Sequence, residues 1–333
     1  MYRQGMAVFG SLAVTLTSVV RSHYAIPRTC GRKQPVIEGT YRKMARRAFL
    51  AATGISALVL GIFAILAGWQ AFRYWAATTA HFCLRIWAAV PEILQIMLGI
   101  SAAIGLISGG LWLLSAGKQW WITAGAVRSL GRKAVDPPPR VLTLLARRSL
   151  THRVVVYHDA HALALTLGPI ASRIMISTGL IETLDDNELD AVLLHEESHL
   201  RNRDPLYLLL ARALVTAFFY LPVVGALVQR YQAAIELAAD EYVIGKQGGS
   251  FSLSSAIVKL LRVRPSTAIA TPFTGVADLR LSYLLERDVN LPGVSQWSVL
   301  QSAAAVAAII VPVASIYGLA GMLNHIAFSR CIV

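Results

Sequence analysis

The feature that most constrains this sequence is a set of long apolar stretches that contain no charged residue. Residues 48–72 (AFLAATGISALVLGIFAILAGWQAF) are 25 residues without a charge, and residues 94–116 and 299–323 are also uncharged. A helix needs about 20 apolar residues to cross the hydrocarbon core of a bilayer. Each of the three stretches is therefore predicted to form a transmembrane helix.

Two further apolar stretches have more than one interpretation. Residues 6–20 are short enough for a signal-peptide core, but Arg21 follows at once, and we expect an uncleaved first span. Residues 206–228 are interrupted by Arg212 and Pro222. This second stretch is predicted to be a span, a half-inserted helix or a buried helix, and the sequence alone leaves the choice open.

The basic residues of the chain indicate how it crosses the membrane. The chain is 56% hydrophobic and 15% charged, with 31 Lys and Arg against 18 Asp and Glu. Such a composition excludes intrinsic disorder and is unusual for a soluble enzyme. Basic residues gather in 21–47 and 117–153, whereas 73–93 has only two, so the positive-inside rule places both basic segments in the cytoplasm. Membrane orientation explains the net charge of +13, and no nucleic-acid partner is predicted.

These patterns divide the chain into four parts. The predicted parts are a membrane region (1–116), a basic cytoplasmic linker (117–153), a cytoplasmic domain (154–298, with the apolar segment 206–228) and a last span (299–323).

The cytoplasmic domain is predicted to combine a small sheet with helices. Residues 154–157, 162–167 and 173–177 are short and β-branched or alternating, and we expect them to form an antiparallel sheet. Asp185 and Glu188 then match a capping box before an apolar helical pattern.

That helix carries the motif His195-Glu196-Glu197-Ser198-His199, an HExxH. Residues four apart lie on one helix face, so both imidazoles can bind one metal ion. Glu196 is then placed to accept a proton from an activated water. The alternative is a chance HExxH on an amphipathic helix, which the preceding cap and sheet disfavour.

A third metal ligand is predicted downstream of the HExxH motif, in the helix that contains ELAAD, residues 236–240. Glu236 and Asp240 are four residues apart and share a face. Glu236 can complete the site, and Asp240 can accept the second ring N–H of a ligand histidine, most simply His199. A solvated acidic helix face is the alternative for this pair taken alone.

The segments HEESHLRNRD and ELAAD together resemble the membrane metallopeptidases of the BlaR/MecR type, which have a gluzincin core and are related to HtpX-like and Ste24-like proteases. The resemblance implies an α-helical multi-span membrane protein with a cytoplasmic α+β mini-gluzincin zinc protease domain. It further implies one Zn²⁺ per chain and a multi-pass protein of the bacterial plasma membrane. Antibiotic sensors of that type add an extracellular penicillin-binding domain after the last span, and we do not expect one here, because ten residues follow residue 323.

The same resemblance implies roles for two more residues. Asp204 matches a position that the family fills with Asp, although the sequence favours it as the N-cap of the next helix, ahead of Pro205. Arg280 is a candidate for stabilising an oxyanion, and a surface arginine on a helix is its alternative. Segment 206–228 is expected to form a helical hairpin against or within the membrane.

The predicted function is that of a zinc endopeptidase with Glu196 as the general base. We expect strand 173–177 to hold an extended peptide by edge pairing. The resemblance implies a cytoplasmic or membrane protein as substrate, such as a BlaI-type repressor or the protease itself. The alternatives are a signalling or quality-control membrane protein whose zinc site is structural, and a scaffold or transporter without zinc.

Overall fold

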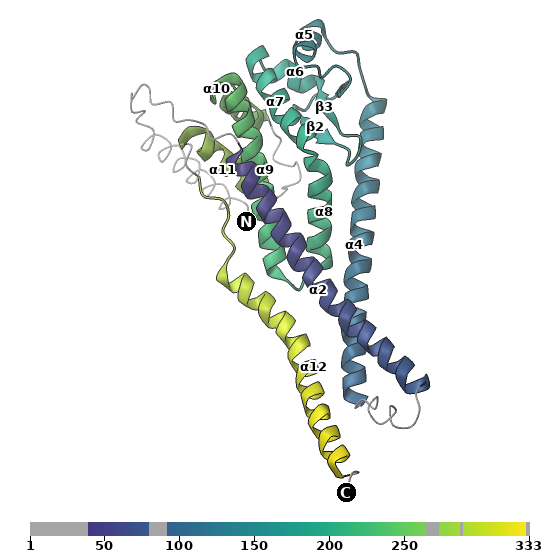
Figure 1. Ribbon diagram of the computed structural model, residues 1–333. Coiled ribbons are helices and arrows are strands. Elements are labelled where there is room, and N and C mark those ends of the chain that lie inside the picture. The colour runs from purple at the N-terminus through teal and green to yellow at the C-terminus, as the bar shows by residue number, and fades with distance from the viewer. Residues whose placement is uncertain (1–38, 80–91, 264–272, 287–288, 331–333) are drawn as a thin grey trace, which may run out of the picture. The chain divides into compact units, whose positions relative to one another are not determined.

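The protein is mostly helical with one small sheet (Figure 1). A computed structural model describes residues 39–79, 92–263, 273–286 and 289–330. The helices are α2 (Thr40–Thr79), α4 (Glu92–Arg132), α5 (Pro139–Arg147), α6 (Thr178–Thr183), α7 (Asp186–Asn202), α8 (Asp204–Ala217), α9 (Pro222–Gln247), α10 (Phe251–Val263), α11 (Phe273–Glu286) and α12 (Gln296–Arg330). The strands are β1 (Val154–Tyr157), β2 (Ala164–Leu167) and β3 (Arg173–Ser177).

The three strands form a mixed sheet in the order β1-β3-β2. β1 runs parallel to β3, whereas β2 pairs antiparallel with β3. The prediction of an all-antiparallel sheet was therefore wrong for β1. Two consequences matter for function: β3 occupies the centre of the sheet, and β2 pairs with only one described strand.

Helix α7 begins and ends through local interactions that the sequence encodes. The side chain of Asp185 accepts hydrogen bonds from the backbone N–H groups of Asn187 and Glu188, and Glu188 bonds back to the N–H of Asp185. This confirms the predicted capping box. At the other end, Arg203 adopts a left-handed conformation, with φ of 55°, and α8 starts at the next residue.

Helix α7 is buried on two sides. Leu189, Val192 and Leu193 pack with the sheet, α5 and α6 in one apolar cluster. Ala191 and Leu194 belong to a second cluster, which is formed with α2, α8 and α9. The metal-binding motif is thus carried by a helix that is clamped between the sheet and the long helices.

Two of the predicted spans coincide with helices that are long and apolar enough to cross a membrane. These are Thr40–Trp69 in α2 and Ile96–Arg132 in α4. The predicted third span lies in α12, where Gln296–Pro312 is a shorter apolar stretch of the described chain. Residues 6–20 lie outside the described residues.

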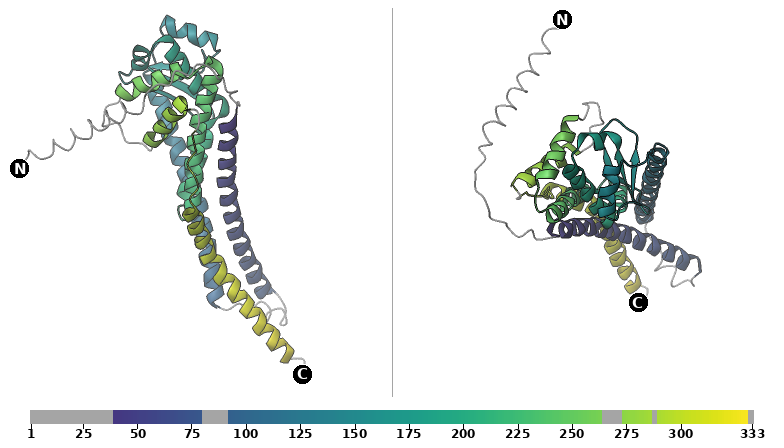
Figure 2. Two further views of the ribbon diagram at one scale, coloured as in Figure 1. Left: turned by 90° about the vertical axis from the view of Figure 1, so that its left-hand side faces the viewer. Right: turned by 90° about the horizontal axis from the view of Figure 1, so that it is seen from above.

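Segment 206–228 forms a helical hairpin, with α8 and α9 joined by residues 218–221. The tip of the hairpin packs against the middle of α2, where Phe218 and Leu221 share a cluster with Val59 and Phe63. Figure 1 and the left view of Figure 2 show the sheet toward one end of the long helices, while α12 extends toward the other end. The first half of the predicted linker is not a separate segment, because α4 continues to Arg132.

Candidate metal centre

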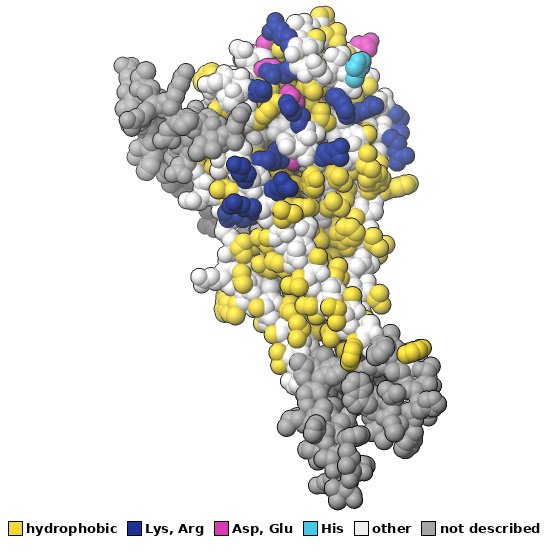
Figure 3. All heavy atoms as spheres, viewed as in Figure 1, with side chains coloured by type: hydrophobic (Ala, Val, Ile, Leu, Met, Phe, Trp, Pro, Cys, Tyr) yellow, Lys and Arg dark blue, Asp and Glu magenta, His cyan; other side chains and the backbone are white. Residues whose placement is uncertain are grey.

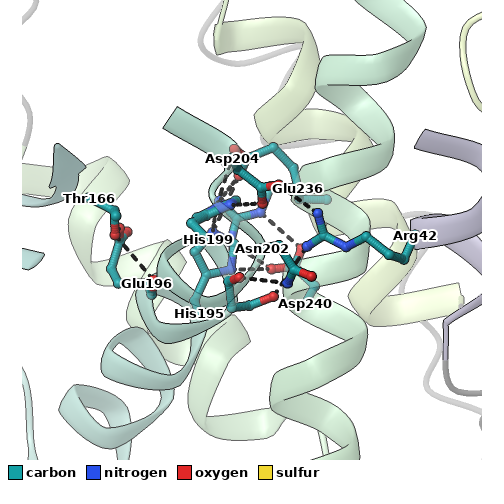
Figure 4. A network of polar contacts seen from close by, with 11 residues as sticks. Arg42, Thr166, His195, Glu196, His199, Asn202, Asp204, Glu236 and Asp240 are labelled. Carbon is teal, nitrogen blue, oxygen red and sulfur yellow. Dashed lines mark hydrogen bonds and ion pairs between the residues drawn. The ribbon is translucent and has the colours of Figure 1, made fainter. Parts of the chain in front are cut away.

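Three predicted ligands converge although they come from two helices. His195 and His199 project from one face of α7, and Glu236 projects from α9, which packs beside it. The three possible ligand atoms lie within 4.8 Å of one another. Figure 4 shows the three side chains turned toward a common point.

The spacing of these atoms fits a tetrahedral zinc ion. Bonds of about 2.0–2.1 Å in tetrahedral geometry separate neighbouring ligand atoms by roughly 3.3–3.4 Å. The two histidine Nε2 atoms are 3.2 Å apart. Glu236 places one carboxylate oxygen 3.3 Å from Nε2 of His195 and the other 3.7 Å from Nε2 of His199. Three nitrogen and oxygen donors in this arrangement are typical of zinc peptidases.

His195 is held by a carboxylate and an arginine. Its Nδ1 lies 2.9 Å from Oδ1 of Asp240, and a carboxylate only accepts, so Nδ1 carries the hydrogen and Nε2 keeps its lone pair for a metal. Arg280 donates from Nη2 and Nε to the two oxygens of Asp240, at 2.7 and 2.9 Å. Its Nη1 also lies 3.2 Å from Glu236. The prediction that Asp240 serves His199 was therefore wrong, since Asp240 faces His195.

His199 is held by a second carboxylate and a second arginine. Its Nδ1 lies 2.8 Å from Oδ2 of Asp204, and Oδ1 of Asp204 accepts a 2.6 Å hydrogen bond from Nη1 of Arg42. The sequence had favoured Asp204 as an N-cap, but the cap position belongs to Arg203, and no side chain caps α8 there. Asp204 is instead the first residue of α8, and its side chain is turned toward the metal centre.

The charges of the site favour a bound cation. Burial alone would raise the pKa of Asp240, yet Arg280 and the hydrogen bond from His195 hold it below its usual range. The pKa of Glu236 is lowered in the same way, because His195, His199 and Arg280 outweigh the effect of burial. Burial and Arg280 lower the pKa of His195, but Asp240 and Glu236 outweigh them and raise it to about 9. The two carboxylates thus favour positive charge at the imidazole of His195.

Glu196 lies beside the ligands on α7 but has a partner outside the metal group. Thr166 of β2 donates to Oε2 of Glu196 at 2.6 Å. In the view of Figure 4, Thr166 and Glu196 lie on the opposite side of the histidines from Arg42. The neighbouring Glu197 points elsewhere, toward Arg201 and the hydroxyl of Tyr242.

Arg280 is not the surface arginine that was its alternative, since its side chain is only 19% exposed. Two residues of the site, Arg42 and Thr166, were not predicted from the sequence. Arg42 sits in the basic run 42–47, where charge pattern alone does not distinguish it from its neighbours. Thr166 lies on a predicted strand. Its contact with Glu196 depends on how that strand packs against α7, which the sequence does not show.

Comparison with known proteins identifies the family. The family described as BlaR1 peptidase M56 matches residues 88–271, more than half of the chain. The chain belongs to the M56 peptidase family. The matched region includes α7 and α9, so it contains the His-His-Glu group of a metallopeptidase.

This M56 chain is also similar to proteases named HtpX. Protease HtpX of Erwinia tasmaniensis is 29% identical over 134 residues, which are 37% of this chain and 45% of that protein. Protease HtpX of Glaesserella parasuis is 25% identical over 213 residues, 58% of this chain and 74% of the relative. A Protease HtpX homolog of Aquifex aeolicus is 26% identical over 189 residues, 51% and 61% of the two chains. The matches thus span from under half to about three quarters of these relatives.

Proposed function

We propose that this M56 chain is a membrane-embedded zinc metalloendopeptidase. The observation that carries the proposal is the convergence of two Nε2 atoms and the Glu236 carboxylate, with Glu196 next to the first ligand on the same helix. Family membership supports the same reaction class. One zinc ion per chain is the proposed cofactor.

The proposed chemistry divides between the ion and the chain's own residues. Zinc, when bound, supplies Lewis acidity that activates water and polarises a carbonyl group. Glu196 accepts a proton from the attacking water and passes it to the leaving amine. Asp240 and Asp204 keep both histidines in the tautomer that presents Nε2. Arg280 is held by Asp240 and Glu236, and its role toward an oxyanion stays a prediction.

The peptide substrate is proposed to bind along β2. The central position of β3 removes it from the edge-pairing role that the sequence suggested. β2 pairs on one side with β3, and its Thr166 donates to Glu196, so this strand lies beside the candidate base. An extended peptide paired with this strand would place a scissile bond near the metal group.

The proposed location is a bacterial plasma membrane, with the sheet and the metal centre on the cytoplasmic side. On the face shown in Figure 3, Lys and Arg gather toward the end with the sheet, and hydrophobic side chains cover the region below it. Exposed apolar residues of α2 and α4, such as Leu58, Ile65, Leu106 and Leu114, suit contact with lipid. The hairpin of α8 and α9 reaches the same level, because its tip contacts Val59 and Phe63.

The proposed substrates are cytoplasmic or membrane proteins. A BlaI-type repressor and the chain itself are the specific candidates, and both come from the resemblance to antibiotic-sensor peptidases. The opposing hypothesis is that the zinc site is structural.

Glu196→Gln separates the two hypotheses. The substitution removes the base but keeps all three ligands, so we expect at least a 1,000-fold loss of peptide hydrolysis with unchanged zinc content, on the order of what enzymes owe to a general base and its alignment. The measurement uses full-length protein in detergent, an unstructured reporter protein and zinc analysis. Glu197→Gln, on the same helix but pointing away from the metal group, is the matched control. Undiminished cleavage by Glu196→Gln would refute the enzyme hypothesis.

A further inference from the structure

Helix α2, a candidate membrane span, packs against the helices that carry the ligands through a stripe of small buried residues. Ala45, Ala48 and Ala52 of α2 are buried, at most 4% exposed, and recur at helical spacing. They belong to the same apolar cluster as Ala191 and Leu194 of α7. Small side chains allow α2 to lie close to the helices that carry the ligands.

Arg42 lies about one helical turn before Ala45 on the same face of α2, and its contact with α8 is polar. Its Nη1 donates to Oδ1 of Asp204 at 2.6 Å, and its Nη2 lies 3.4 Å from the hydroxyl of Ser198. The basic neighbours Lys43, Arg46 and Arg47 are exposed, whereas the Arg42 side chain is 27% exposed. Arg42 is therefore the member of the basic run that turns inward.

The contact acts on a zinc ligand through one intermediate. The side chain of Asp204 is 4% exposed, so its carboxylate needs partners for both oxygens. Arg42 binds one oxygen and Nδ1 of His199 binds the other. Groups that orient a ligand histidine in this way affect metal affinity by about 10–100-fold.

We propose that Arg42 is a positioning residue for His199, and that through it the metal affinity depends on the position of α2. The proposal rests on the metal centre of the proposed function. A shift of α2 by the rise of one residue, about 1.5 Å, exceeds what a 2.6 Å hydrogen bond tolerates. Movement of a membrane helix would thereby loosen His199 without any contact between α2 and the ion.

The first experiment compares Arg42→Gln with Arg46→Gln in full-length protein in detergent. Arg46 lies one turn along α2 and is exposed, so it provides the matched control. Zinc affinity is measured by competition with a chelator, and Co²⁺ substitution gives an absorption spectrum that reports the ligand geometry. We expect about 10–100-fold weaker zinc binding and an altered Co²⁺ spectrum for Arg42→Gln, with no change for Arg46→Gln. Arg42→Lys keeps the charge and should lose less affinity.

A second pair of variants moves α2 without touching a polar group. Ala48→Leu overfills the contact between α2 and its neighbours, whereas Ala51→Leu makes the same change on the exposed face of the helix. We expect Ala48→Leu to weaken zinc binding in the same direction as Arg42→Gln, and Ala51→Leu to leave it unchanged. A combined Arg42→Gln and Asp204→Asn variant should lose little more affinity than Asp204→Asn alone, because both act through one contact.

Each outcome bears on the proposal. Wild-type affinity and an unchanged Co²⁺ spectrum in Arg42→Gln would overturn it, and if that variant does not fold, wild-type values in Ala48→Leu and Arg42→Lys do so. A wild-type chain that binds no zinc overturns the metal centre and this proposal together. A wild-type chain that binds zinc but does not cleave peptides refutes the proposed function alone, and the Arg42 comparison then still decides the inference.

Discussion

The two ligand histidines are supported by the same chemistry but by different parts of the molecule. Each donates from Nδ1 to an aspartate, and each aspartate is bound by an arginine. For His195 both supporting residues, Asp240 and Arg280, come from α9 and α11. For His199 the supporting arginine comes from α2, a candidate membrane span.

The two supports also differ in how firmly they are built. Arg280 makes two hydrogen bonds to a fully buried Asp240 and a further contact with Glu236. Arg42 makes one short hydrogen bond to Asp204 and is more exposed. The support of one histidine thus comes from α9 and α11, while that of the other includes α2, a candidate membrane span. We call His195, Asp240 and Arg280 the stable half of the metal centre. His199, Asp204 and Arg42 form the adjustable half.

The largest effect is expected from Asp240→Asn. The change removes the fully buried carboxylate that binds both Arg280 and Nδ1 of His195, so zinc affinity should fall about 100-fold. The free energy of unfolding should fall by about 3–5 kcal/mol, the range for breaking a buried ion pair. Chelator competition and thermal unfolding measure the two effects. Glu182→Gln, an exposed acid on α6, is the control, and equal values for the two variants would contradict the stable-half interpretation.

Arg280→Gln and Arg42→Gln provide the direct comparison between the halves. Arg280→Gln removes the arginine that pairs with both Asp240 and Glu236, and we expect about 3 kcal/mol of lost stability. Arg42→Gln removes the charged hydrogen bond to Asp204 and the longer one to Ser198, for which about 2 kcal/mol is expected. Melting of the metal-free proteins tests the order. If Arg42→Gln destabilised the protein more than Arg280→Gln, the assignment of firm and adjustable halves would have to be reversed.

The ligands could be predicted from the sequence because residues four apart lie on the same face of a helix. His195 and His199 are four residues apart on one helix, and Glu236 and Asp240 repeat that spacing on another. The sequence could not predict which aspartate faces which histidine, because that depends on how α7 and α9 pack. Asp204 looked like an N-cap for the same reason: its neighbour in space, Arg42, is 162 residues away in sequence.

The sheet shows a similar limit. The bounds of β1 and β3 followed from β-branched residues and turn signals, and the structure has the same bounds. Strand order and direction depend on long-range pairing, so the parallel partner of β3 was missed. This error affected the functional prediction, because it assigned peptide binding to the edge of β3, which lies in the centre of the sheet.

A smaller effect is expected at Thr166, which belongs to neither half. Thr166→Val removes the hydroxyl that donates to Glu196 but keeps the shape of the side chain. We expect kcat/KM for peptide hydrolysis to fall about tenfold, the lower end of the value of a hydrogen bond to a charged group, with zinc affinity unchanged. Thr143→Val, exposed on α5, is the control. A loss of zinc affinity in Thr166→Val would show that β2 supports the ligands as well as the base.

The smallest effect is expected at the N-terminal end of α7, the helix from which both histidines project. Glu188 accepts hydrogen bonds from Lys259 and Ser255, both at 2.6 Å. Burial alone would raise the pKa of Glu188, but these two hydrogen bonds hold it below its ordinary value of 4.5. A carboxyl with a lowered pKa adds stability above its unfolded pKa and loses it as the pH falls through its folded pKa.

Wild-type stability should therefore decrease more steeply than that of Glu188→Gln as the pH falls below about 4.5. Near neutral pH, Glu188→Gln should cost about 1–2 kcal/mol, since it replaces charged hydrogen bonds with neutral ones. Thermal unfolding of both proteins across this pH range provides the measurement. Zinc affinity at neutral pH should stay the same, because Glu188 lies two helical turns before His195 and contacts neither supporting aspartate. A change in zinc affinity would mean that the N-terminal end of α7 also affects the positions of His195 and His199. Among the described helices, α2 would then not be the only one whose position influences zinc binding.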